Sequence, residues 1–221
     1  MEVKKALVGL ICIQLYLSGC SGRNQAAELD FEHSNMRQRE LEIVSVREDD
    51  ERMEAPFDKD TPIDTVKKDP VFRNYGHLLF PVNDWYMDGD TLGKLRLTWY
   101  SHIDSEETVE IVNTLWQRAN DGETIFYDIY SDEEKASDPA KEDTGLFFFK
   151  GNPGAKFAVC NAGGGFVYVG AMQDSFPHAL ELSKLGYNAF ALIYRPGAQT
   201  ACEDLARAIS FIFEHAEESL K

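Results

Sequence analysis

The chain has 221 residues, of which 43% are apolar and 12% aromatic, so it is long enough to bury one core of ordinary domain size. Its 38 acidic and 22 basic residues give a net charge of -16, which makes nucleic acid an improbable partner. The four cysteines imply no disulfide framework.

Residues 1–19 have the layout of a bacterial signal peptide. Two lysines precede an apolar run, residues 6–17, which is too short to span a bilayer, and small residues follow. The junction LSGC at residues 17–20 resembles the lipobox of bacterial lipoproteins, in which the cysteine is acylated. We therefore expect export and a lipid anchor at Cys20 that holds the protein on the outer side of the bacterial cell membrane. The alternative is plain secretion with cleavage near Gly19.

Residues 20–70 are predicted to form a disordered acidic tether. From residue 21 to residue 70 charged and polar side chains crowd together with few aromatic ones, so burial would not repay the ordering of the backbone. The segment LEIVSV inside it, residues 41–46, could be a short helix or a strand. We interpret the tether as a spacer rather than as a specific binding tail.

Residues 71–122 are predicted to form an extension of loops, short extended pieces and one helix. Asp104 followed by Glu107 is a helix start signal, and apolar residues at helical spacing predict an amphipathic helix over residues 105–120. This helix is a possible lid. The three tryptophans could line a ligand pocket, although core packing is the commoner role of such residues: Trp85, Trp99 and Trp116.

Residues 123–221 alternate between strand and helix patterns, which predicts an α/β fold of about four strands with flanking helices. The predicted strands lie within residues 123–130, 145–151, 156–164 and 187–195. One helix is expected to begin at Asp174 or Ser175, either of which can cap it, and to end at Gly186. A last helix from about Ala201 is expected to place one apolar face inward: Leu205, Ile209, Ile212, Phe213 and Ala216.

Three consecutive glycines, residues 163–165, follow the third predicted strand. A dinucleotide fingerprint would need glycine where Tyr168 stands, and a phosphate-binding P-loop would need lysine where Ala171 stands. Both nucleotide interpretations fail, so neither a cofactor nor a metal is expected. A purely structural alternative is that the glycines make a tight strand-to-helix turn.

The segments FAVCNAGGGFVYVG, LGYNAFALIYRPG and ACEDLARAISFI together resemble the first half of the α/β-hydrolase fold, in its acetyl-esterase and lipase branch. The resemblance covers roughly residues 76–221 and makes residues 123–221 the N-terminal half of that domain. It implies that Gly164 and Gly165 donate the oxyanion hydrogen bonds to a small acyl ester, while Gly163 lets the loop turn. Arg195 and Asp204 match positions that look structural in the family.

The catalytic triad of the family has no counterpart in this sequence. None of the serines lies in a G-x-S-x-G nucleophile elbow, and neither His178 nor His215 has a serine and an acid arranged around it. The resemblance therefore implies the N-terminal portion of a membrane-anchored serine esterase, truncated before the elbow and inactive as given. One alternative is a non-catalytic exported lipoprotein that uses the half-sheet as a binding or interaction module. Another is an unrelated α/β protein.

Two further expectations concern the sheet edge and the thiols. In the family the third strand lies between the fourth and a fifth, so the edge at residues 157–160 should expose unpaired backbone groups, and residues 20–221 should be poorly soluble alone. Cys160 and Cys202 are expected to be small buried thiols rather than a disulfide.

Overall fold

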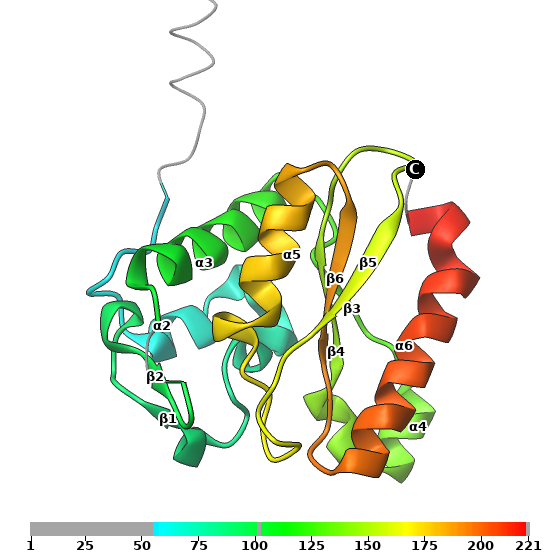
Figure 1. The fold of residues 1–221 in the computed structure, drawn as a ribbon, viewed down its shortest axis with the longest axis horizontal. Coiled ribbons are helices and arrows are strands. Elements are labelled where there is room, and N and C mark those ends of the chain that lie inside the picture. The colour runs from blue at the N-terminus through cyan, green and yellow to red at the C-terminus, as the bar shows by residue number, and fades with distance from the viewer. Residues whose placement is uncertain (1–54, 101–102, 220–221) are drawn as a thin grey trace, which may run out of the picture. The chain divides into compact units, whose positions relative to one another are not determined.

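The computed structural model describes residues 55–100 and 103–219 (Figure 1). The chain divides into two units, Met1–Met53 and Glu54–Lys221, and every described residue belongs to the second. The expected signal peptide, Cys20 and the tether up to residue 54 lie outside the described residues. Within the described ranges, no helix is both long and apolar enough to cross a bilayer.

A mixed four-stranded sheet forms the centre of this unit (Figure 1). Its strands are β3 (Phe126–Tyr127), β4 (Gly145–Phe149), β5 (Phe157–Asn161) and β6 (Asn188–Ile193), in the spatial order β3-β4-β6-β5. Strand β4 runs antiparallel to both of its neighbours, whereas β5 runs parallel to β6. All four strands fall within the predicted ranges, so the expected α/β class is confirmed.

Helices cover both faces of the sheet (Figure 1). Helices α3 (Ser105–Asn120) and α5 (Ser175–Lys184) lie on one face, and α4 (Asp132–Ser137) and α6 (Ala198–Ser219) lie on the other. Strands β4 and β6 are buried at every position. This burial explains their continuous apolar sequences, because a strand covered on both faces needs apolar side chains on both.

Helix α3 begins and ends where the sequence predicts. The carboxylate of Asp104 accepts hydrogen bonds from the N–H groups of Glu106 and Glu107, at 2.9 and 3.3 Å, and so caps the first turn. The helix buries Ile111 and Leu115 in the core and contacts α5. It therefore packs as a layer of the fold, and its possible role as a lid stays a prediction.

The ordered unit starts well before residue 71. Helix α2 (Ile63–Lys67) buries Ile63 and Val66 and is followed by the 3-10 helix η1 (Pro70–Leu79). Phe57 is also buried, and its backbone N–H and C=O both bond to the side chain of Asn113 on α3. The prediction of disorder is wrong for residues 55–70. Phe57, Ile63 and Val66 are buried there, although most of their neighbours in the sequence are charged or polar.

Four short 3-10 helices and one small hairpin complete the unit. The hairpin pairs β1 (Met87–Asp88) with β2 (Arg96–Leu97). The 3-10 helices are η2 (Asp84–Tyr86), η3 (Leu92–Lys94), η4 (Pro139–Asp143) and η5 (Ala171–Gln173). They carry the chain around the end of the sheet at which strands β5 and β6 finish, as Figure 1 shows for the hairpin and the loops.

Helix α6 buries only part of the predicted stripe. Ala208 and Ile212 face the core, but Ile209 and Phe213 are 40% and 69% exposed. Asp204, expected on the outer side, is fully buried. The apolar pattern does not predict the burial of Asp204, which turns inward to pair with Arg195.

Candidate functional site: the glycine loop after β5

The glycine loop, residues 162–170, joins the end of β5 to η5 and α5. Its backbone takes positive φ at three successive residues: 138° at Gly164, 62° at Gly165 and 61° at Phe166. A Cβ on Gly164 would lie 2.1 Å from the carbonyl oxygen of Tyr168, so only glycine fits there. The turn expected at Gly163 is therefore made one residue later, since Gly163 does not have a positive φ.

Backbone hydrogen bonds fix the shape of the loop. The N–H of Gly170 donates to the carbonyl of Gly163 at 3.0 Å, and the N–H of Val167 donates to the carbonyl of Gly164 at 3.1 Å. The carbonyl of Ala162 accepts from the Tyr194 hydroxyl at 2.7 Å. The carbonyls of Ala162, Gly163 and Gly164 are thus all engaged within the protein.

The backbone N–H groups of Gly164 and Gly165 differ from these engaged carbonyls. Neither the N–H of Gly164 nor that of Gly165 donates a hydrogen bond to any residue that the structure describes. Gly164 is buried and Gly165 is exposed. A buried N–H is normally paired, so two consecutive free donors in a fixed loop are a natural place for an anionic oxygen.

Asp174 supports the loop in a way that the sequence did not reveal. It precedes α5 and was predicted to cap that helix, but its side chain makes no capping hydrogen bond. Its Oδ2 instead accepts from the N–H of Gly163 at 2.8 Å and from the Tyr100 hydroxyl at 3.4 Å. Burial, and then the Asp174 carboxylate, raise the pKa of Tyr100, which keeps this phenol protonated.

Aromatic side chains flank the loop. The rings of Tyr86 and Tyr168 stack at 4.9 Å, and Trp99 lies 5.8 Å from Tyr168. Trp99 is 68% exposed and has a φ of 71°, and its ring would lie 3.2 Å from a Cβ placed on Gly165. Trp85 is 86% exposed, so the expectation of core packing is wrong for both of these tryptophans. Trp116, in contrast, is half-buried against Phe57.

An apolar pocket of about 220 Å³ lies beside the loop. It is bounded by Val167 and Tyr168 of the loop, by Ile193 at the end of β6, and by Phe80 and Val82. The pocket lies at the carboxyl ends of the parallel strands β5 and β6, and this end is where open α/β sheets usually bind their ligands.

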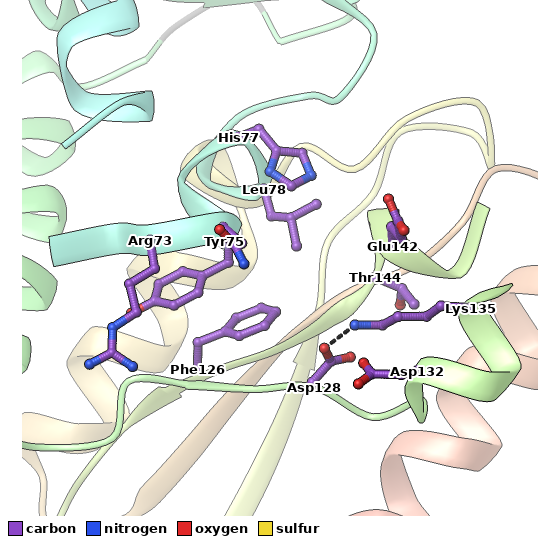
Figure 2. Close-up of a pocket in the computed structure, with 11 residues that line it drawn as sticks. Arg73, Tyr75, His77, Leu78, Phe126, Asp128, Asp132, Lys135, Glu142 and Thr144 are labelled. Atoms are coloured by element: carbon purple, nitrogen blue, oxygen red, sulfur yellow. Dashed lines mark hydrogen bonds and ion pairs between the residues drawn. The ribbon is translucent and has the colours of Figure 1, made fainter. Parts of the chain in front are cut away.

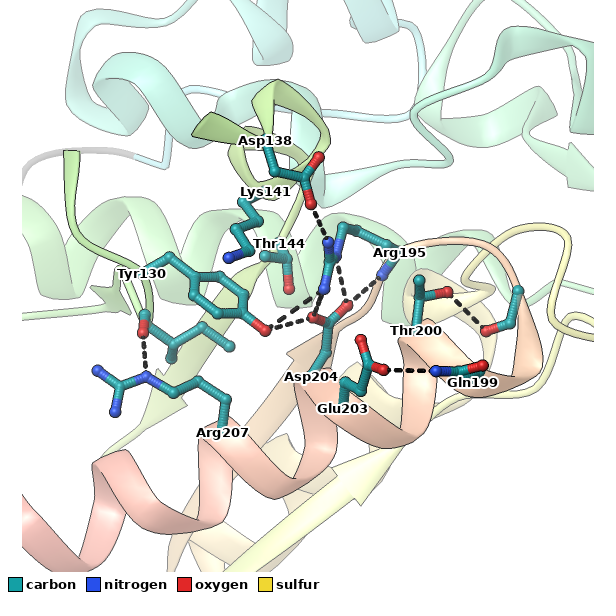
Figure 3. Close-up of polar contacts among 12 residues, drawn as sticks. Tyr130, Asp138, Lys141, Thr144, Arg195, Gln199, Thr200, Glu203, Asp204 and Arg207 are labelled. Carbon is teal, nitrogen blue, oxygen red and sulfur yellow. Dashed lines mark hydrogen bonds and ion pairs between the residues drawn. The ribbon is translucent and has the colours of Figure 1, made fainter. Parts of the chain in front are cut away.

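Arg195 and Asp204 form a buried pair on the α6 side of the sheet (Figure 3). The guanidinium Nη2 and the Asp204 Oδ1 lie 2.7 Å apart, and the Arg195 backbone N–H also donates to this carboxylate at 2.8 Å. Tyr130 donates to the same carboxylate at 2.7 Å, and Asp138 binds the other side of the guanidinium. The pair joins the end of β6 to α6 and to the segment after β3, so its position fits the structural role that was expected.

The histidines and cysteines of the described part form no catalytic group. His178 is exposed and faces Asp174 at 3.4 Å, while His215 bonds to the carbonyl of Phe211 within α6. Cys160 and Cys202 are both free, as expected, but Cys160 is only half-buried and Cys202 is exposed. Burial raises the pKa of the Cys160 thiol, which weakens it as a nucleophile. No metal-binding group occurs among the residues that the structure describes.

Comparison with known proteins assigns nothing further. No protein-family model matches this chain, and no curated protein or solved structure is significantly similar to it. Any function must therefore follow from the geometry of the loop and its surroundings.

Proposed function

We propose that this chain is the N-terminal portion of an exported, lipid-anchored α/β-hydrolase that acts on carboxylic esters. In this proposal Gly164 and Gly165 bind the carbonyl oxygen of a small acyl ester. The observation that carries it is the pair of consecutive N–H groups that have no acceptor among the described residues. Cys20 would hold the enzyme at the membrane.

The chemistry requires donors that are already in place when charge develops. When a nucleophile adds to an ester carbon, the carbonyl electron pair moves to oxygen, and the resulting oxyanion needs hydrogen-bond donors. The positive φ values at Gly164 and Gly165, and the engaged carbonyls of Ala162, Gly163 and Gly164, fix the turn that carries these two N–H groups. In enzymes that use such donors, the loss of one costs about 3 to 4 kcal/mol of transition-state stabilisation.

The sheet order adds support. The resemblance implied that the strand before the glycine loop would pair with the fourth strand on one side and with a fifth on the other. Strand β5 pairs with β6, and within the described residues its other edge is open. Under the proposal this edge receives a strand that leads to the nucleophile, because no G-x-S-x-G occurs in these 221 residues.

A direct test begins with the coding sequence beyond codon 221. The proposal expects a G-x-S-x-G within about 20 codons, the spacing that a strand and turn after the last helix would need. The protein from the joined reading frame should hydrolyse p-nitrophenyl acetate. Unrelated downstream sequence, or a joined protein that folds without activity, would contradict the proposal.

Variants of the joined protein separate the amide role from folding. Gly164→Val should abolish hydrolysis. Gly165→Ala should lower kcat and also cost some stability, since this residue has a φ of 62° and the new methyl group meets the exposed Trp99 ring. Gly154→Val is the matched control, because Gly154 also has positive φ but has open space around it. Full activity in both loop variants would remove the oxyanion assignment.

A second candidate is a non-catalytic exported lipoprotein that uses the half-sheet as a binding or interaction module. The absence of a nucleophile elbow from the 221 residues favours it. A stable purified chain that binds an ester without hydrolysing it, and whose gene contains no downstream elbow, would support this candidate over the first.

A further inference from the structure

A second cavity, of about 550 Å³, lies away from the glycine loop, between η1 and the segment from β3 to η4 (Figure 2). Its volume is in the range of small-molecule binding sites. We name it the Phe126 pocket after the aromatic residue near its centre. The proposed ester chemistry makes no use of it.

The pocket has a rigid aromatic floor. The rings of Phe126 and Tyr75 stack with centroids 4.5 Å apart and planes 11° from parallel. Both rings pack edge-on against the fully buried Phe147, at 5.1 and 6.0 Å. The floor is thus anchored in the core of the protein, and Phe126 is half-buried, so part of its ring faces the pocket. Figure 2 shows the Phe126 ring between the two ends of the pocket.

Polar side chains line the rim at both ends. In Figure 2, Arg73 lies at one end, and Asp132, Lys135 and Glu142 lie at the other. Lys135 forms an ion pair with Asp128, which neutralises one carboxylate. Arg73, Asp132 and Glu142 make no side-chain hydrogen bond or ion pair with other described residues.

The backbone at Arg73 is strained. Its φ of 48° and ψ of -124° interrupt η1, and a non-glycine residue rarely adopts a positive φ. Such strain is most often found where it positions a side chain for function. Here it places the guanidinium at the end of the pocket opposite the carboxylates.

This combination of groups selects for a neutral ligand with hydroxyl groups. Carboxylates only accept hydrogen bonds and a guanidinium only donates them, whereas a hydroxyl does both. Asp132 and Glu142 at one end repel an anion, and Arg73 at the other end repels a cation. A sugar ring has hydroxyls around its edge for both ends of the pocket and a C–H face for the Phe126 ring. It also loses no charge solvation on binding.

We propose that the Phe126 pocket is a binding site for a neutral carbohydrate. The sugar ring lies on Phe126, its hydroxyls donate to Asp132 and Glu142, and other hydroxyls accept from Arg73. This site is separate from the glycine loop and stands whether or not the chain takes part in ester hydrolysis.

The test is a binding measurement on the full 221-residue chain. Neutral oligosaccharides of glucose, xylose and N-acetylglucosamine are titrated by calorimetry, with a lysine-containing zwitterionic dipeptide as the comparison. Saturation-transfer NMR then identifies which ligand protons contact the protein. At least one oligosaccharide should bind, with the strongest transfer to the C–H protons of one ring face.

Three variants locate the site. The double variant Asp132→Ala and Glu142→Ala should weaken binding at least about tenfold, since hydrogen bonds to charged groups are lost. Glu133→Ala, in the same turn of α4 as Asp132, should leave the affinity unchanged. Phe126→Leu keeps an apolar group in the core but removes the flat ring, and should also weaken binding while the protein stays folded.

Three results would overturn the proposal. They are the absence of binding by every oligosaccharide, equal affinity in the double variant and the unchanged chain, and binding of the dipeptide alone. The last result would assign the pocket to a zwitterionic ligand.

Discussion

Gly164 is the residue whose identity the loop constrains most. It combines a φ of 138° with a close approach to the Tyr168 carbonyl, so any side chain is both strained and obstructed. We predict that Gly164→Ala lowers the free energy of unfolding by about 3 kcal/mol, whether or not the loop binds a ligand. Urea unfolding followed by circular dichroism measures this.

The neighbouring glycine provides the control for that prediction. Gly163 does not have a positive φ, and a Cβ there would meet only the end of the Tyr100 and Asp174 side chains. Gly163→Ala should therefore cost clearly less than Gly164→Ala. Equal losses at the two positions would mean that the loop does not have the described conformation.

Tyr130 gives the fold a pH dependence at high pH. Burial, and then the hydrogen bond to Asp204, raise the pKa of Tyr130 from 10.0 to about 12. Between these two values the folded chain binds more protons than the unfolded chain, so stability is complete below pH 10 and falls as pH rises toward 12. Urea midpoints measured from pH 8 to pH 12 should show this fall.

Replacing Tyr130 by phenylalanine should reduce the slope of that fall. The variant also loses the hydrogen bond to Asp204, so it should be less stable at pH 8. A smaller fall must remain, because burial also raises the pKa of Tyr168 to about 12. A slope identical to that of the unchanged chain would contradict the role given to Tyr130.

The sequence indicated which single residues matter, but it did not show in which direction their side chains point. The three glycines stood out as a consecutive run, although only Gly164 combines a positive φ with a close backbone approach, and Gly163 does not have a positive φ. Asp174 was placed correctly before α5, but propensity favours a cap there and does not show that the carboxylate turns to Gly163 instead. Trp85 and Trp99 were expected in the core because such aromatic side chains most often pack there, but both are exposed in this structure.

Strand β5 is the element whose environment is least complete within the described residues. It pairs with β6 alone, and its residues Phe157 to Cys160 are only half-buried. Phe213 of α6 packs edge-on against Phe157 at 5.6 Å while remaining 69% exposed. Unpaired strand edges beside apolar side chains promote association between chains.

We therefore predict concentration-dependent self-association of residues 20–221, which Phe213→Lys should reduce. Sedimentation velocity at several concentrations measures it. Leu185→Lys makes the same change of charge at a residue that is 73% exposed after α5, and should have less effect. A monodisperse, cooperatively melting monomer of the unchanged chain would contradict the prediction.

Some helices and strands were predicted well from the sequence, and others were not. The four strands and α3 were predicted well, because continuous apolar runs and a capping carboxylate are local signals. The buried face of α6 was predicted only in part: Ile212 is buried, but Ile209 and Phe213 are exposed, and Asp204 is buried in an ion pair with Arg195. The resemblance implied only that the third and fourth predicted strands are neighbours, and the antiparallel pairing of β4 with β3 and β6 was not predicted.

At the scale of the whole molecule, the described unit joins the predicted extension and the sheet into one body. Residues 55–122 contribute Phe57, Leu79 and Leu115 to the same core as Phe147. Composition alone placed the start of the ordered part at about residue 70, because the buried residues of α2, Ile63 and Val66, stand among many acidic residues. The alternation of strand and helix patterns predicted the α/β class, but composition and charge do not locate the boundary of the core.

The central claim is that the amides of Gly164 and Gly165 receive negative charge on a ligand oxygen. It is tested most directly by NMR of the 15N-labelled full chain, titrated with the tetrahedral anion of a methylphosphonate monoester. The account predicts saturable downfield shifts of the Gly164 and Gly165 amide protons, with the Gly122 and Gly154 amides unchanged. Unmoved signals from residues 164 and 165 at ligand concentrations that shift other amides would contradict it.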